Sequence, residues 1–117
     1  MAASRGQVEI FLTTFHNCWP PQYIVINREN NRQALADLGL MPRHREEIIC
    51  NLTVDHYSDG PLPDDSPAKD DVWIFGCEVD SIEIYIKLLL KLMGSSFTAK
   101  CLSFHPAEFP LAYPFRE

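Results

Sequence analysis

Four side chains with acid–base or hydrogen-bonding chemistry are spaced so that they share one face of a predicted β-sheet. They are Tyr85, Lys87, Ser103 and His105. The first two lie two residues apart in the run 81–90, and the last two do so in the run 98–105. Because side chains alternate along a strand, residues two apart point to the same side. Histidine exchanges a proton near neutral pH and lysine is a cation, so the set predicts a site that binds an anion and moves a proton.

The remaining side chains of the same two runs predict the buried face of that sheet. The apolar set is Ile82, Ile84, Ile86, Leu88, Leu102 and Phe104. By the same alternation, Cys101 is expected on the side of Ser103 and His105. A second interpretation stays open, because antiparallel sheets normally have one solvated face on which polar residues collect without any shared chemistry.

Three helices are expected ahead of this sheet. The first covers 7–17, where apolar residues recur at the helical period. Its inward face consists of Val8, Phe11, Leu12 and Phe15. Asn30 or Asn31 is expected to cap a second helix, which ends at Gly39. Pro42 suits the first turn of a third helix, because proline loses no hydrogen bond there.

Strands are expected at 22–27, 71–79, 81–90 and 98–105. The segment 53–71 is predicted to be a loop, since one glycine and three prolines punctuate it. A tight turn near Asp80 joins two of the strands. Helices followed by an antiparallel meander indicate an α+β fold, with the N-terminal helices packed on one face of an antiparallel β-sheet. The 117 residues are expected to form a single domain, 1–117.

Charges are distributed unevenly along the chain, whose net charge is −6. Seven acidic side chains and one lysine lie between 61 and 83, whereas 84–117 carries four basic and two acidic side chains. The acidic balance argues against nucleic acid as a partner, but the basic C-terminal third permits anion binding there. No apolar run approaches the ~20 residues that cross a bilayer and no signal peptide is evident, so a cytoplasmic protein without a membrane partner is expected.

Neither the cysteines nor the histidines predict a metal site, and no cofactor is expected. Cys18, Cys50, Cys77 and Cys101 lie far apart without a Cys-x-x-Cys pair, so buried, reduced thiols are predicted. Cys101 and His105 are separated by about 13 Å on a strand that rises ~3.3 Å per residue, too far to share one ion. Motifs of nucleotide hydrolysis, zinc proteolysis and esterase chemistry are absent from the sequence.

The C-terminal segment after His105 alternates apolar residues with prolines and small residues. Its large apolar members are Phe109, Leu111, Tyr113 and Phe115. The alternation predicts an extended segment packed on the sheet edge, where proline also prevents unwanted edge pairing. Direct contact between this segment and a substrate is the alternative.

Several ordered segments match a known pattern of motifs. They are "RQALADLGLMPRHREEIICNLTVDHYSDGPL" (32–62), "VWIFGCEVDSIEIYIKLLL" (72–90) and "CLSFHPAEFPLAYPF" (101–115). The strongest motifs are an A-L-x-x-L-G-L helix end, an I-I-x-x-L helix leading to Tyr57, a Y-[IL]-K strand and an [LV]-S-F strand. In their order and spacing these motifs, from about Val8 to Phe115, resemble the MqsR-type toxins of bacterial type II toxin–antitoxin systems.

The resemblance implies an mRNA interferase with a RelE-like fold that cleaves single-stranded RNA without a metal and is neutralised by a cognate antitoxin protein. The family's strand tyrosine falls on Tyr85, and the basic residue two positions later falls on Lys87. A functional lysine of the family falls on His105. Two other family positions are not kept: one lysine is Ser58 here, and a glutamine expected near Trp73 has no counterpart.

The expected function is therefore that of a metal-independent endoribonuclease that uses the ribose 2′-hydroxyl as nucleophile. His105 is expected to be the acid–base group, Lys87 to stabilise the phosphoryl oxygens and Tyr85 to position or assist proton transfer. Ser103 adds a hydroxyl donor for the substrate.

Two further contacts with the RNA are expected, and one alternative function stays open. Arg116 is expected to clamp a flanking phosphate, and Tyr57 or an exposed aromatic residue of 109–115 to stack on a base. The alternative function is a non-catalytic, toxin-like module that binds an antitoxin or another protein through the acidic segment 61–71.

Overall fold

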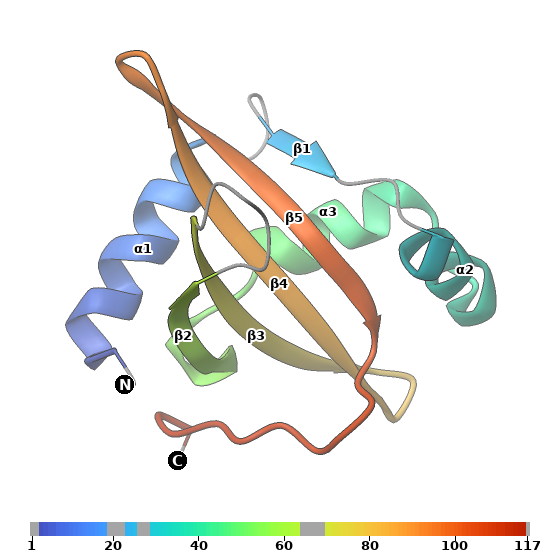
Figure 1. Ribbon diagram of the computed structural model, residues 1–117. Coiled ribbons are helices and arrows are strands. Elements are labelled where there is room, and N and C mark those ends of the chain that lie inside the picture. Colours follow the sequence, from blue (N-terminus) through green and yellow to red (C-terminus); the bar gives the residue numbers. More distant parts are fainter. Residues whose placement is uncertain (1–2, 19–22, 26–28, 64–69, 117) are drawn as a thin grey trace.

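The computed structural model describes residues 3–18, 23–25, 29–63 and 70–116 (Figure 1). In chain order the elements are α1 (Arg5–Cys18), β1 (Tyr23–Val25), α2 (Glu29–Leu38), α3 (Pro42–Cys50), a short 3₁₀ helix η1 (Val54–His56), β2 (Tyr57–Pro63), β3 (Asp71–Val79), β4 (Ile82–Met93) and β5 (Ser96–Pro106). The α+β class is as predicted. None of the helices in the described ranges is long and apolar enough to span a bilayer.

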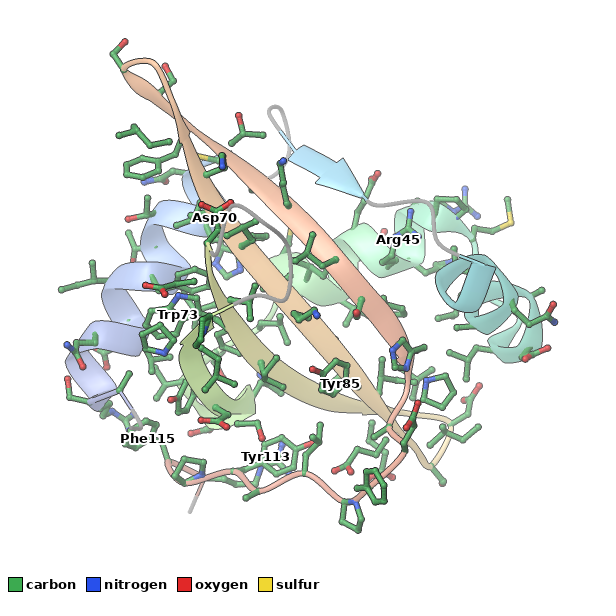
Figure 2. The ribbon with its side chains drawn as sticks, viewed as in Figure 1. Arg45, Asp70, Trp73, Tyr85, Tyr113 and Phe115 are labelled. Carbon is green, nitrogen blue, oxygen red and sulfur yellow. The ribbon has the colours of Figure 1, made fainter. Side chains whose placement is uncertain are left out.

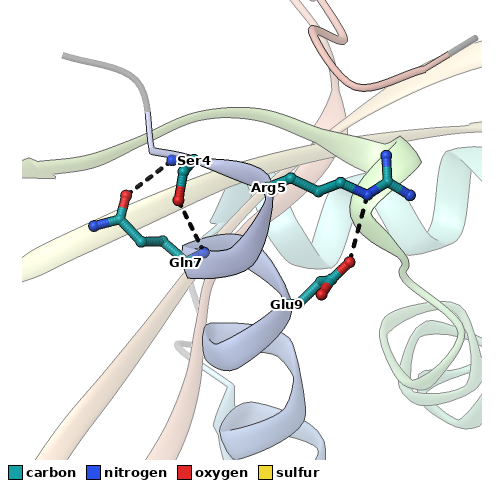
Figure 3. Close-up of polar contacts among 4 residues, drawn as sticks. All are labelled: Ser4, Arg5, Gln7 and Glu9. Atoms are coloured by element: carbon teal, nitrogen blue, oxygen red, sulfur yellow. Dashed lines mark hydrogen bonds and ion pairs between the residues drawn. The ribbon is translucent and has the colours of Figure 1, made fainter.

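Helix α1 begins with a reciprocal capping box (Figure 3). The Gln7 backbone N–H donates to Ser4 Oγ at 3.2 Å, and the Ser4 backbone N–H donates to Gln7 Oε1 at 2.8 Å. Arg5 and Glu9 form an ion pair one turn apart, with Nε 3.4 Å from Oε1. The inward face of the helix is the predicted one, and its four apolar side chains are all buried.

Helices α2 and α3 agree with the sequence pattern except at one end. Gly39 ends α2 with a φ of 68°, a conformation that glycine adopts without a Cβ clash, and Pro42 opens α3. The predicted cap of α2 is wrong, because the helix already begins at Glu29 and both Asn30 and Asn31 lie inside it.

The sheet has the strand order β1-β5-β4-β3-β2. Strands β2 to β5 form the expected antiparallel meander, whereas β1 lies parallel to β5, with Tyr23 opposite Ala99. The expectation of a wholly antiparallel sheet is thus corrected at this edge. Asp80 and Ser81 both have positive φ, 50° and 68°, as the two-residue hairpin turn between β3 and β4 requires.

The predicted loop 53–71 is largely a regular structure. Residues 54–56 form η1, and Tyr57–Pro63 form β2, which pairs with β3 through two register shifts. Glycine and proline indicated a loop, but an edge strand tolerates both because one of its sides needs no ladder hydrogen bonds. Residues 64–69 lie outside the described part of the chain.

All three helices lie on one face of the sheet, as predicted (Figure 1). The main core joins their inward side chains to one face of β3, β4 and β5. On β4 this face contributes Ile84, Ile86 and Leu88, which are fully buried. Ile82 departs from the prediction and is 42% exposed, because it borders the hairpin turn at the end of the strand.

A β-bulge in β5 changes which side chains enter the core. Lys87 pairs with Ser103, but the next pair is Leu88 with Cys101, so Leu102 is the extra residue. Cys101 therefore packs in the main core, and Leu102 packs in a small cluster with Val72 and Leu89 on the other face. The predicted faces of Cys101 and Leu102 are wrong for this reason, since strict alternation does not survive an inserted residue.

Candidate active site

The four side chains singled out in the sequence form two neighbouring cross-strand pairs on the face away from the helices. Tyr85 on β4 lies directly opposite His105 on β5, and Lys87 lies opposite Ser103. The Tyr85 and His105 rings stack with centroids 5.4 Å apart and planes inclined by 20°. Opposed residues of an antiparallel pair have Cβ atoms about 4.5–5.5 Å apart, so one small ligand reaches all four groups.

These four side chains line a cavity of about 370 Å³, called the His105 cavity below. Its other wall comes from the C-terminal tail, residues 107–116, through Glu108, Phe109, Pro110 and Leu111. Tyr85 is seen on β4 above the tail in Figure 2. The cavity is thus formed by two rigid strands on one side and an extended segment on the other, which is a suitable arrangement for a small polar ligand.

His105 is held in a defined orientation at this cavity. Its Nδ1 lies 2.9 Å from the Pro106 carbonyl oxygen. A carbonyl oxygen only accepts, so Nδ1 carries the proton in this contact and Nε2 of the neutral ring keeps its lone pair. The side chain is partly exposed, so the ring is accessible to solvent or to a ligand.

The other cavity groups provide one cation, one anion and two hydroxyls. Burial raises the pKa of Tyr85, and the nearby charge of Asp59 adds to this shift, so the phenol stays protonated at neutral pH. Ser103 is only 5% exposed. Lys87 is partly exposed and supplies the positive charge, whereas Glu108 brings a carboxylate to the tail side. An anion is therefore favoured near Lys87 rather than near the tail.

The tail is hydrogen-bonded to the sheet through Glu83 on β4. The Ala107 backbone N–H donates to the Glu83 carbonyl oxygen at 2.9 Å. The two carboxylate oxygens accept from the Leu111 backbone N–H at 2.9 Å and from the Tyr113 hydroxyl at 2.8 Å. Burial, followed by this hydrogen bond, raises the pKa of Tyr113. These contacts confirm that the tail packs on the sheet, but it lies against the interior strands β3 and β4 rather than along the predicted edge.

Close packing against β3 completes the attachment of the tail. Gly76 lies directly beneath it, and a Cβ at this position would come within 2.6 Å of Leu111 Cδ1 and would overlap the Tyr113 hydroxyl. Phe115 stacks on Tyr57 with ring centroids 5.5 Å apart, and Tyr113 and Phe115 are both labelled in Figure 2. Only glycine at position 76 allows the tail to lie this close to the strand.

Two residues expected to contact a substrate are placed elsewhere. Tyr57 is fully buried, where its hydroxyl accepts from the Ala3 backbone N–H at 3.1 Å and donates to the Gly60 carbonyl oxygen. It therefore has no ring face for a base, and its predicted stacking role is wrong. Arg116 does not line the His105 cavity; its guanidinium lies over the Tyr113 ring, 3.9 Å from the centroid.

The other three histidines bond to the backbone of the helical layer. His16 Nε2 donates to the Ile49 carbonyl oxygen at 2.8 Å and so links α1 to α3. His44 Nδ1 and His56 Nδ1 each accept from a backbone N–H three residues earlier, at 2.9 Å, at the starts of α3 and η1. Burial lowers the pKa of His56, and the Arg116 charge contributes. These contacts give the three residues structural roles.

The four cysteine thiols differ in burial, and none of them lines the His105 cavity. Cys101 is buried in the core, where desolvation raises its pKa to about 12, and partial burial raises that of Cys77 to about 11. Cys50 is exposed, so the prediction of buried thiols is wrong for it. Within the described ranges, no group of three or more His, Cys, Asp or Glu side chains is arranged to hold a metal ion.

Sequence reasoning did not identify the groups that close the cavity. Glu83 lies two residues before Tyr85 and is predicted on the same face of the strand. Nothing in its spacing indicates that a segment 28 residues later binds to it. Gly76 likewise has no local signature, because its importance comes from the close approach of the tail. These are contacts between distant segments.

Comparison of the chain with protein-family models, with curated proteins and with solved structures finds no match. The fold and the site define an α+β protein with an acid–base and cationic cavity on the face opposite its helices. The likeness to the MqsR-type toxins stays a prediction, and a function for the chain has to be inferred from the His105 cavity.

Proposed function

We propose that this protein is a metal-independent endoribonuclease that cleaves single-stranded RNA, and that it acts as an mRNA interferase toxin of the MqsR type with a RelE-like fold. The observation that carries the proposal is the His105 cavity, in which a histidine, a lysine, a phenol and a buried hydroxyl converge. Cleavage of RNA without a metal needs a base, an acid and a fixed positive charge at one phosphate. The cavity supplies one group for each role.

The first step is removal of the ribose 2′-hydroxyl proton by His105. The Nδ1 contact with the Pro106 carbonyl leaves Nε2 as the basic atom of the neutral ring. The 2′-oxygen then attacks the adjacent phosphorus, and a bond between O2′ and P forms. A positioned acid–base group of this kind contributes about 10²–10⁴-fold to the rate.

The second step is loss of the 5′-oxygen. The bond between phosphorus and the 5′-oxygen breaks, and the 5′-oxygen takes up a proton, so the products carry a 2′,3′-cyclic phosphate and a 5′-hydroxyl. Tyr85 is the donor, because its raised pKa keeps the phenol protonated. Lys87 stabilises the charge on the phosphoryl oxygens, and Ser103 donates a hydrogen bond from the cavity floor.

The test is digestion of a single-stranded RNA by the purified protein with EDTA present, followed by mapping of the new ends. Cleavage that leaves 5′-hydroxyl ends is expected for the wild type, and His105→Ala is expected to lower the rate about 10²–10⁴-fold. His44→Ala is the matched control, since His44 does not line the cavity. Undiminished cleavage by His105→Ala, or 5′-phosphate ends, contradicts the mechanism.

A biological test addresses the toxin assignment. Expression of the wild-type chain in bacteria is expected to arrest growth, and co-expression of its antitoxin is expected to relieve the arrest. His105→Ala, made at the same level, is expected to permit growth. Arrest by both proteins alike would separate toxicity from the cavity.

A second candidate function, a protein-interaction module, is favoured by one apolar feature. A groove of about 350 Å³, called the α1 groove below, is lined mainly by apolar side chains from α1 and the sheet. It includes Trp73, which stacks on Phe11 with centroids 4.4 Å apart. The acidic segment 61–71, expected earlier as a partner site, is described only at 61–63 and 70–71. Absence of both growth arrest and RNA cleavage would leave this module as the better assignment.

A further inference from the structure

Phe109 is the most exposed of the large apolar side chains in the described part of the chain. Its side chain is 76% accessible, and it stands on the wall of the His105 cavity. Two later tail residues, Leu111 and Tyr113, are partly buried against the sheet. An aromatic ring left in water beside polar, charged groups is a typical feature of a ligand-binding surface.

The backbone on both sides of Phe109 is fixed. Ala107 and Leu111 donate their backbone N–H groups to the carbonyl and the carboxylate of the same residue, Glu83, each at 2.9 Å. Pro110 follows directly and disfavours a helical backbone at Phe109. The backbone that carries the ring is therefore held at both ends beside the cavity. This segment is ordered before a ligand binds, so binding does not have to order it.

We propose that Phe109 is the stacking platform for the nucleobase next to the phosphate held at Lys87 and His105. This inference rests on the proposed ribonuclease function and specifies how that site selects its substrate. Nucleobases in single strands expose a face to an aromatic side chain, whereas in a duplex both faces are covered by neighbouring pairs. Stacking accepts any base, so Phe109 selects single-stranded RNA without selecting a sequence.

The test uses a fluorescently labelled single-stranded RNA in which every ribose is 2′-O-methylated, so that no 2′-hydroxyl is available and binding is measured without cleavage. The loss of one base-stacking contact corresponds to roughly 5- to 150-fold weaker binding, and Phe109→Ala is expected to show this. Phe109→Trp is expected to retain binding. Phe109→Leu, which keeps an apolar side chain without an aromatic face, is expected to bind as weakly as Phe109→Ala.

Ile10→Ala is the matched control, because Ile10 is 69% exposed and lines the α1 groove, outside the His105 cavity. Its binding is expected to equal that of the wild type. Wild-type cleavage of natural RNA together with full binding by Phe109→Ala or Phe109→Leu overturns the stacking role and leaves the proposed function intact. A wild type that neither binds the methylated strand nor cleaves natural RNA overturns the proposed function, and the stacking role with it.

Discussion

Two hollows of similar size lie on opposite faces of the sheet and differ in what lines them. The His105 cavity measures about 370 Å³ and the α1 groove about 350 Å³. The cavity holds an imidazole, an ammonium and hydroxyl groups, whereas Gln7 and Thr14 are the polar side chains of the groove. The two hollows are thus similar in volume but differ in the chemistry that they can support. The side chains that line a hollow, rather than its size, indicate where a reaction is feasible.

The two hollows also differ in how they are closed. Residues of the α1 groove come from α1 and from strands whose other side chains form the main core. The His105 cavity instead depends on the tail, which is attached through Glu83 and Gly76. A site closed by one extended segment is more easily opened by a single substitution than a groove between a helix and a sheet.

The largest effect is expected when the positive charge is removed from the His105 cavity. Lys87→Ala is expected to lower the rate of RNA cleavage about 10²–10³-fold, because one fixed donor to the developing phosphoryl charge is lost. Lys91→Ala is the matched control on the same strand, since Lys91 pairs with Asp70 at 2.8 Å and does not line the cavity. Single-turnover cleavage rates measure the difference. Equal rates for the two variants would show that the cavity cation is not used.

Displacement of the tail tests whether the cavity needs its second wall. Gly76→Ala is expected to destabilise the protein by about 1–3 kcal/mol, because the new methyl group overlaps Leu111 and Tyr113. Cleavage is expected to fall along with the stability. Gly6→Ala is the control, since no atom lies within 4 Å of its Cβ position and alanine favours the helix. In urea unfolding, the midpoint of Gly76→Ala should lie below that of the wild type, and the midpoint of Gly6→Ala should lie above it.

Alkaline pH should weaken the tail attachment before it affects the groove. The pKa of Tyr113 is raised, by burial and by its hydrogen bond to Glu83, so the folded state keeps a proton that the unfolded state loses near pH 10. The resulting stability is fully present below about pH 9 and is lost as the pH rises through the folded-state pKa. Urea midpoints measured between pH 8 and 10.5 should decline, and less so for Tyr113→Phe. A midpoint independent of pH over this range would contradict the attachment.

The smallest effect is expected in the α1 groove. Ile10→Ser should change the free energy of unfolding by no more than about 0.5 kcal/mol, because the side chain is mostly exposed. It should leave RNA cleavage unchanged, since Ile10 takes no part in the His105 cavity. Reduced cleavage by Ile10→Ser would mean that the substrate extends across both faces, and the two hollows would then belong to one site.

Much of the fold was predictable because its signals are local. The apolar spacing in 7–17 selects the buried face of α1, and the alternation in 81–90 selects the buried face of β4. The failures occur where tertiary contacts override local preference. Residues 57–63, rich in glycine and proline, nevertheless form an edge strand against β3, and β1 pairs in parallel with β5.

The candidate site was predictable to a similar extent. The alternation of side chains along two strands predicted that Tyr85 shares a face with Lys87, and Ser103 with His105. The cavity contains all four. The same alternation predicted the wrong faces for Cys101 and Leu102, because a bulge inserts one residue into β5. Alternation also gave no reason to exclude Tyr57, which is buried by contacts with distant residues that include Ala3 and Phe115 at opposite ends of the chain.

The amino-acid order alone determined which side chains share a face of each strand and each helix, because these periods follow from backbone geometry within a few residues. Tertiary structure alone decided that Tyr85 lies opposite His105, that a bulge turns Cys101 into the core, and that Glu83 holds the tail over the cavity. Register, bulges and closure depend on the packing and hydrogen bonding of segments far apart in the chain, and no local period encodes them.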